Sequence, residues 1–167
     1  MNKMSKETPD THPLVAVIRL RSGIGLRHEA KETLTLLNLS RVNHAVVLDK
    51  RPTFLGMFQK AKDAITWGEI DAPTLTRLLR KRGRLLGNKP ITDEYVSKHS
   101  QYKTIDEYAK ALVALKEPGI SLPKFKKVFR LHPPSKGFRG SLKRTIQQKG
   151  ELGYRGEDIN ALLKRMS

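Results

Sequence analysis

Three short apolar stretches alternate with two segments of helical periodicity between residues 13 and 72. Residues 14–21 (LVAVIRLR) are β-branched and aliphatic until arginines alternate in, which is typical of a buried strand with one exposed end. Residues 45–48 and 65–70 are the other two predicted strands. The order β-α-β-α-β predicts a small open-faced sandwich of the α+β class, with the helices on one face of a three-stranded sheet.

Each of the two intervening segments has one apolar face. In the first helix this face consists of Leu26, Ala30, Leu34 and Leu37, at spacings of four, four and three. In the second, over residues 54–62, it consists of Phe54, Met57, Phe58 and Ala61. A strand–helix–strand connection of this length permits a parallel pair with a right-handed crossover, and the pattern alone leaves the direction of the third strand open.

The positive charge is concentrated after residue 72. The chain has 33 Lys and Arg against 16 Asp and Glu, a formal charge of +17, of which residues 1–72 contribute +3 and residues 73–167 contribute +14. Such an excess repels itself and is usually neutralised by a polyanion, so the composition indicates a nucleic-acid partner. The absence of cysteine excludes a disulfide scaffold, a thiolate metal site and a cysteine nucleophile.

Four segments are predicted. Residues 1–12 form a flexible polar arm without the apolar stretch of a signal peptide, and residues 13–72 form the core. Residues 73–122 form a helical extension, and residues 123–167 form a basic strand or arm with a closing helix. Because no run of eighteen apolar residues occurs, no membrane span is expected and a cytoplasmic location is the default.

Helix signals divide the second half of the chain. Asp71 and Pro73 predict a helix over residues 74–86, and Thr92 caps a short one over 93–99. A capping box at Thr104 and Glu107 predicts a helix over 106–116, and residues 157–166 form the last. Residues 133–150 contain no acid and several Gly and Pro, so we expect a segment without regular structure that is mobile in the free protein.

Three acid-free basic stretches favour RNA or DNA binding. The first is a stripe on the helix after residue 72, opposite its leucine face: Arg77, Arg80, Lys81 and Arg84, at i, i+3, i+4 and i+7. The other two contain Lys124, Lys126, Lys127, Lys136, Arg139, Lys143, Arg144 and Lys149. Cations neutralise phosphates. The interleaved Phe125, Phe129 and Phe138 either stack on bases or anchor the core. For Phe129 we favour a place in the core. For the stripe, a merely solvated face is the alternative.

No catalytic or cofactor site is predicted. Gly23-Ile24-Gly25 lies between a strand and a helix, but it lacks the third glycine of a dinucleotide site and the lysine of a P-loop. A tight turn with positive φ is the simplest interpretation, and an RNA phosphate held by backbone N–H groups and Arg27 is the alternative. The histidines lack metal-ligand spacing, and the adjacent acids lie in first turns of helices. We therefore expect no enzyme, no metal, no cofactor and no small-molecule substrate.

Short motifs in the core resemble a known family. They are R-S-x-I-G from Arg21 to Gly25, L-x-L-x-R-x-N-H from Leu37 to His44, and Gly56-Met57. In this order and spacing they resemble the ribosomal protein family called L-thirty in bacteria and archaea and L-seven in eukaryotes. FRLHPPSKGF and GYRGEDINALLKRM resemble the C-terminal part of archaeal and eukaryotic members. Since the long basic N-terminal tail of eukaryotic members is absent, the chain resembles an archaeal-type member.

The resemblance implies a structural protein of the large ribosomal subunit that binds folded large-subunit rRNA near the 5S rRNA, beside other large-subunit proteins. It implies an antiparallel sheet related to the ferredoxin-like class. The motif positions expected near RNA are Arg21, Ser22, Gly25, Arg27, Arg41, Asn43 and His44. A free RNA-binding regulator or RNA chaperone, needing the same charges, is the alternative. An RNA-processing enzyme would need acids or histidines converging on one site, and the sequence predicts none.

Overall fold

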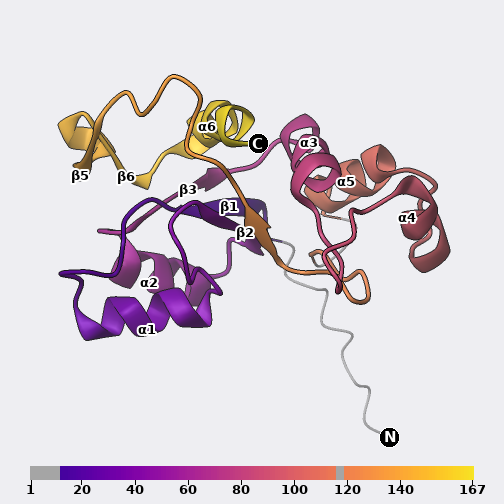
Figure 1. The fold of residues 1–167 in the computed structure, drawn as a ribbon, viewed down its shortest axis with the longest axis horizontal. Helices are drawn as coiled ribbons and strands as arrows, with labels where there is room; N and C mark the ends of the chain where they lie inside the picture. The colour runs from indigo at the N-terminus through magenta and orange to yellow at the C-terminus, as the bar shows by residue number, and fades with distance from the viewer. Residues whose placement is uncertain (1–11, 116–118) are drawn as a thin grey trace, which may run out of the picture.

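The computed structural model describes residues 12–115 and 119–167 (Figure 1). All of the predicted N-terminal arm except His12 lies outside the described residues. In chain order the helices and strands are β1 Leu14–Arg19, α1 His28–Leu36, β2 His44–Asp49, α2 Pro52–Ala61, β3 Ile65–Glu69, α3 Ala72–Arg82, α4 Asp93–His99, α5 Ile105–Val113, β4 Val128–Arg130, β5 Ser141–Thr145, β6 Gly150–Tyr154 and α6 Ile159–Met166. The α+β class and the β-α-β-α-β order of the core are confirmed.

β1 is the central strand of the core and is antiparallel to both of its neighbours. Leu14 lies opposite Asp49 of β2, and Val15 lies opposite Glu69 of β3. The antiparallel sheet implied by the family resemblance is therefore present, and the parallel pair that the connection length permitted does not form between these strands.

The C-terminal part of the chain adds strands to both edges of this sheet, whose order is β4-β2-β1-β3-β6-β5. β4 is antiparallel to β2, whereas β6 is parallel to β3 and β5 is parallel to β6. The expectation that residues 133–150 lack regular structure is wrong, because they contain β5 and a 3₁₀ turn, Ile146–Gln148. A glycine makes this pairing possible: a Cβ on Gly150 would lie 2.0 Å from the carbonyl oxygen of Arg144.

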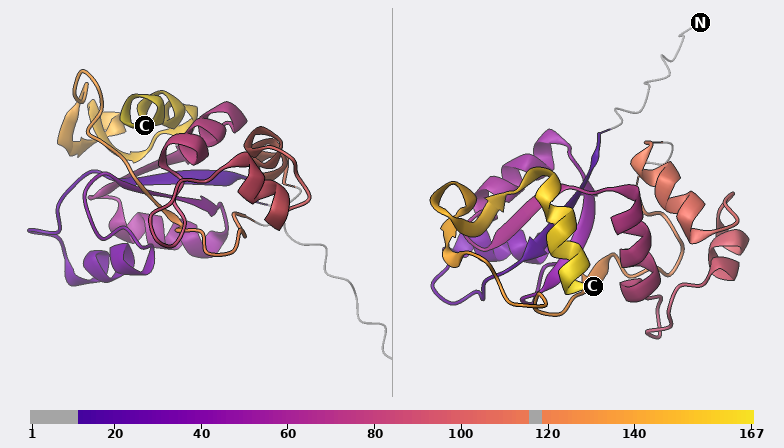
Figure 2. Two further views of the ribbon diagram at one scale, coloured as in Figure 1. Left: turned by 45° about the vertical axis from the view of Figure 1, so that its right-hand side comes forward. Right: turned by 90° about the horizontal axis from the view of Figure 1, so that it is seen from above.

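Helices cover both faces of the sheet. Val15 and Val17 of β1 pack with residues of α1 and α2, as the sequence predicts, in a cluster that includes Leu34 and Phe58. The alternate residues of β1, among them Ile18, pack with α3, α5 and α6. Figure 1 shows α1 and α2 on one side of the strands and α6 on the other. Figure 2 shows α3, α4 and α5 gathered beside the sheet. The helices after residue 72, α6 among them, thus cover the face that the core alone leaves open.

The capping signals of the extension are borne out in part. The hydroxyl of Thr92 accepts a hydrogen bond from the backbone N–H of Tyr95 at 3.3 Å, and that of Thr104 accepts from Glu107 at 3.2 Å. The Glu107 carboxylate, however, accepts from the N–H of Lys103, so the capping box is one-sided. Asp71 precedes α3 as predicted, but its side chain makes no capping hydrogen bond.

The helix ends also differ from the prediction. α3 ends at Arg82 and α5 at Val113, each a few residues earlier than the sequence indicates. The predicted stop at Pro118 lies outside the described residues. None of the helices in residues 12–115 and 119–167 has the length and apolar character needed to cross a membrane.

Candidate RNA interface

The two loops that carry the family-like motifs meet at one buried side chain, Arg19, at the end of β1. Its Nε donates a hydrogen bond to the carbonyl oxygen of Arg21 at 2.9 Å. Its Nη1 donates to the carbonyl oxygens of Leu39 at 2.6 Å and Ser40 at 2.9 Å. Only 8% of Arg19 is exposed, so the expectation that this end of the strand becomes exposed is wrong here. Three backbone acceptors compensate the buried charge.

The motif residues differ in how they present themselves around Arg19. Ser22, Gly25, Arg27 and Arg41 are exposed, whereas Arg21, Asn43 and His44 are half-buried. Arg21 Nη1 donates to the carbonyl oxygen of Asp63 at 3.1 Å, which holds this arginine against the core. The loop after β1 thus carries the exposed Arg27, and the loop before β2 carries the exposed Arg41. The buried Arg19 side chain is hydrogen-bonded to both loops.

His44 is a neutral hydrogen-bonding group at the edge of this region. Burial, and then the charges of Arg130, Arg41 and Arg19, lower the pKa of His44 below its usual value. Its Nδ1 lies 3.4 Å from the hydroxyl oxygen of Ser40. At neutral pH the imidazole therefore has one N–H donor and one nitrogen acceptor.

The turn between β1 and α1 requires glycine at one position. Gly25 has a φ of +75°, which confirms that one of the two glycines takes a positive φ. A Cβ on Gly25 would meet nothing within 4 Å, so the restriction comes from the backbone conformation. Ile24, between the glycines, is 87% exposed. The turn therefore presents backbone and an apolar side chain to solvent beside Arg27.

Replacement of Gly25 by Val is expected to lower the free energy of unfolding by about 1–2 kcal/mol, because a β-branched residue is strained in the left-handed region. Thermal unfolding followed by circular dichroism measures this loss. Gly25→Asn is the matched control and should cost less, since Asn tolerates this conformation. Equal unfolding temperatures for the Val variant and the natural protein would contradict the prediction.

The basic stripe of α3 is shorter than predicted and is partly neutralised. Because the helix ends at Arg82, Arg84 lies beyond it, in an antiparallel bridge to Pro90. Arg80 Nη2 lies 2.7 Å from Asp106 Oδ2 and 3.9 Å from Asp93 Oδ1. The stripe is free of acids in the sequence, as stated above, but α4 and α5 bring these two carboxylates to Arg80 in the fold.

Two other stripe residues have different surroundings. Arg77 Nε donates to the hydroxyl oxygen of Ser167 at 2.9 Å, which ties α3 to the end of α6. Lys81 is exposed on α3. Of the four cations, Lys81 therefore presents its charge most freely to a polyanion.

For this reason the substitutions Lys81→Gln and Arg80→Gln should differ in RNA binding. Loss of one phosphate contact reduces the slope of log K against log salt by about 0.9. We expect this decrease for Lys81→Gln and a smaller one for Arg80→Gln, whose charge already faces two carboxylates. Arg80→Gln should in turn lower stability by roughly 0.2–1 kcal/mol, the range of exposed ion pairs. Filter binding at several salt concentrations tests both, and equal slopes would contradict the assignment.

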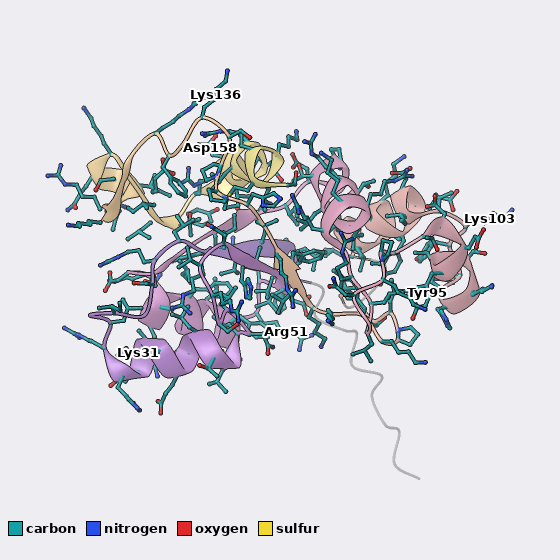
Figure 3. The ribbon with its side chains drawn as sticks, in the orientation of Figure 1. Lys31, Arg51, Tyr95, Lys103, Lys136 and Asp158 are labelled. Carbon is teal, nitrogen blue, oxygen red and sulfur yellow. The ribbon has the colours of Figure 1, made fainter. Side chains whose placement is uncertain are left out.

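The two C-terminal basic stretches combine exposed cations with core anchors. Phe129 of β4 is fully buried, as predicted, and Phe125 packs on it with ring centroids 5.8 Å apart. Figure 3 shows Lys136 pointing away from the body of the molecule. Of the predicted RNA-binding cations in these two stretches, Lys126 is half-buried and the others are exposed: Lys124, Lys127, Lys136, Arg139, Lys143, Arg144 and Lys149. Arg130, at the end of β4, is exposed as well.

Glu151 of β6, which is not among the predicted site residues, positions the basic stretch of residues 136–149. Its Oε1 accepts hydrogen bonds from the backbone N–H groups of Arg139 at 2.9 Å and Gly140 at 2.7 Å. Its Oε2 forms an ion pair with Arg155. Burial alone would raise the pKa of this carboxyl, but the hydrogen bonds and the Arg155 charge together lower it. A sequence signal exists: Glu151 is the only acid between residues 118 and 156.

Within the described ranges, no group of three or more His, Asp or Glu side chains could hold a metal ion.

The sequence model of the family described as "Ribosomal protein L30p/L7e" matches residues 15–65, which comprise most of the β-α-β-α-β core.

Similar proteins extend the match over most of the chain. A protein of Methanobrevibacter smithii named "Large ribosomal subunit protein uL30" is 48% identical over 150 residues, 90% of this chain and 97% of its own. Proteins of the same name from Methanopyrus kandleri and Methanoculleus marisnigri are 46% and 47% identical, over 88% and 92% of this chain and 99% of theirs. The chain belongs to the uL30 family, as an archaeal-type member.

Proposed function

We propose that this chain is a structural constituent of the cytoplasmic large ribosomal subunit, without enzymatic activity. The observation that carries the proposal is the match to proteins named for that subunit, which extends over 97–99% of their length. A net charge of +17 agrees with a polyanionic partner.

We further propose that the chain binds folded large-subunit rRNA near the 5S rRNA, mainly through phosphates. Support comes from the two motif loops, which Arg19 joins through hydrogen bonds and which carry the exposed Arg27 and Arg41. Exposed cations on loops that are joined in this way suit recognition of a folded RNA by shape, because phosphate contacts set register and orientation. The basic residues after position 72 would add contacts to this surface, and neighbouring ribosomal proteins would complete its surroundings.

Cofractionation on sucrose gradients tests the proposal. Tagged chain expressed in an archaeal host should sediment with large subunits, and little should remain in the free pool. A variant with Arg27 and Arg41 changed to Gln should shift toward the free pool, whereas Lys60→Gln, an exposed cation on α2, should not. If the natural chain sediments as free protein, a regulator or RNA chaperone outside the ribosome becomes the better interpretation.

A further inference from the structure

A groove lies between the C-terminal end of α1, the start of β2 and the edge strand β4, and has a volume of about 630 Å³. One wall includes Asn38, Ser40 and His44, and the other includes Phe125, Lys127 and Arg130. Ligand sites for small molecules and cofactors span roughly 300–1,000 Å³, so the groove is large enough for one such group. Residues predicted from separate signals, His44 and Lys127, line the same groove.

The charge of the groove selects an anion. Lys126, Lys127 and Arg130 line it, and none of the described lining residues is acidic. Arg41 adds its charge nearby, since it lowers the pKa of His44 together with Arg130. An anionic group placed here meets several cations and faces no carboxylate of the lining, which favours a phosphate.

The uncharged lining fits a base. Asn38, Ser40 and the neutral His44 supply donors and acceptors of the kind that base edges require. The half-buried Phe125 ring is braced by the buried Phe129 ring, 5.8 Å away at an angle of 59°. A ring held in this way offers a stacking surface at little cost in side-chain entropy, and stacking on aromatic side chains is how proteins bind unpaired bases.

We propose that this groove, the α1–β4 groove, binds one unpaired nucleotide of RNA, with its base against Phe125 and its phosphate at Lys127 and Arg130. The inference rests on the proposed function and adds to it a subsite for single-stranded rather than duplex RNA. β4 is also an edge strand, on which a peptide strand could pair. The three cations of the lining favour the nucleotide.

Nuclear magnetic resonance titration of the full chain tests the proposal. The probes are a short single-stranded RNA, a duplex of the same length, and inorganic phosphate. The single strand should shift the amide signals of Asn38, His44 and Phe125 together, and the other two probes should not. Phe125→Leu, which keeps an apolar contact with Phe129, should weaken single-strand binding roughly tenfold, within the range for loss of one stacked base.

A matched pair of substitutions on α1 separates the groove from the rest of the surface. Thr35 lines the groove, whereas its neighbour Leu36 does not and is 73% exposed. Thr35→Glu places a carboxylate in the groove and should abolish single-strand binding. Leu36→Glu adds the same charge to the same exposed helix turn and should change this binding little.

Four outcomes would overturn the proposal. If the single strand leaves these signals unshifted while the chain still cofractionates with large subunits, the groove assignment fails and the proposed function stands. If Thr35→Glu and Leu36→Glu weaken binding equally, the effect is one of total charge. If a strand-forming peptide, titrated in a separate experiment, shifts the β4 amides and RNA does not, the groove is a protein-binding site. Failure of both RNA binding and cofractionation would refute the proposed function as well.

Discussion

Replacement of Arg19 by Met is expected to lower the free energy of unfolding by about 3 kcal/mol and to weaken rRNA binding. The buried guanidinium donates hydrogen bonds to three backbone carbonyls in two loops. A hydrogen bond to a charged group contributes roughly 1.5–3 kcal/mol, and carbonyls left without a partner keep their desolvation penalty. Without this anchor the Arg21–Gly25 turn and the Leu37–His44 segment lose the side chain that joins them, so the backbone that carries Arg27 and Arg41 should be less well ordered.

Val17→Ala is the matched control for stability. Val17 lies in the same strand, is fully buried and packs toward α1 and α2. Its side chain has no hydrogen-bond donor, so it does not hold the loop carbonyls. A smaller side chain there leaves a cavity and costs about 2 kcal/mol. Urea unfolding and rRNA binding should be measured at a temperature where both variants are folded. Val17→Ala should then bind as the natural protein does, whereas Arg19→Met should not.

The Lys variant completes the test of Arg19. A lysine keeps the charge but replaces the planar fork of donors with a single ammonium group, so it should recover part of the stability and part of the affinity. Equal losses of affinity in Arg19→Met and Val17→Ala would show that Arg19 acts through stability alone and that the two loops need no shared anchor.

Sequence patterns were sufficient for the core because each signal there is local. The apolar run of residues 14–18 and the helical spacing from Ala30 to Leu37 depend only on near neighbours, and both match the observed elements. Sheet direction required the family resemblance, because a connection of this length permits either orientation. Burial of Phe129 was also predicted, from its place between Val128 and Leu131 in the segment VFRL.

The features that the sequence missed depend on long-range contacts. Arg19 looks like the exposed end of a strand, and only the fold brings Leu39 and Ser40 to it. Arg80 has no acid near it in the sequence, and only α5 places Asp106 beside it, 26 residues away in the chain. The α1–β4 groove likewise needs β4 to pair with β2 before its two walls face each other. Such residues are predictable only once it is known which helices and strands pack together.

Replacement of Glu151 by Ala is the second substitution from which we expect a large effect, a loss of roughly 3 kcal/mol in the free energy of unfolding. Removing one partner of a buried ion pair leaves the other charge uncompensated, and costs of about 3–5 kcal/mol are typical. Arg155 keeps some solvent contact, with 15% of its side chain exposed, which puts the expected loss at the lower end. Two backbone N–H groups, of Arg139 and Gly140, also lose their acceptor.

The same carboxylate should give stability a characteristic dependence on pH. Its pKa is lowered in the folded state, despite burial, by Arg155 and the two backbone donors. The unfolded state therefore takes up this proton first on acidification, at a pKa of about 4.3. The contribution of Glu151 is present above that pH and is lost as the pH falls through the folded pKa. Glu151→Gln, which keeps the shape but not the charge, should remove this part of the acid dependence, whereas the exposed Glu157→Gln should not.

Amide exchange decides whether Glu151 holds the basic stretch in the free protein. The composition of residues 133–150 predicts mobility until RNA binds, because five cations repel one another there and few apolar groups offset the ordering entropy. The Glu151 carboxylate is an internal counter-charge for these cations, and it accepts hydrogen bonds from the backbone N–H groups of Arg139 and Gly140. We therefore expect these two amides to be protected in the free natural chain and to exchange quickly in Glu151→Ala. Fast exchange of both amides in the natural chain would show that rRNA, rather than Glu151, orders this stretch.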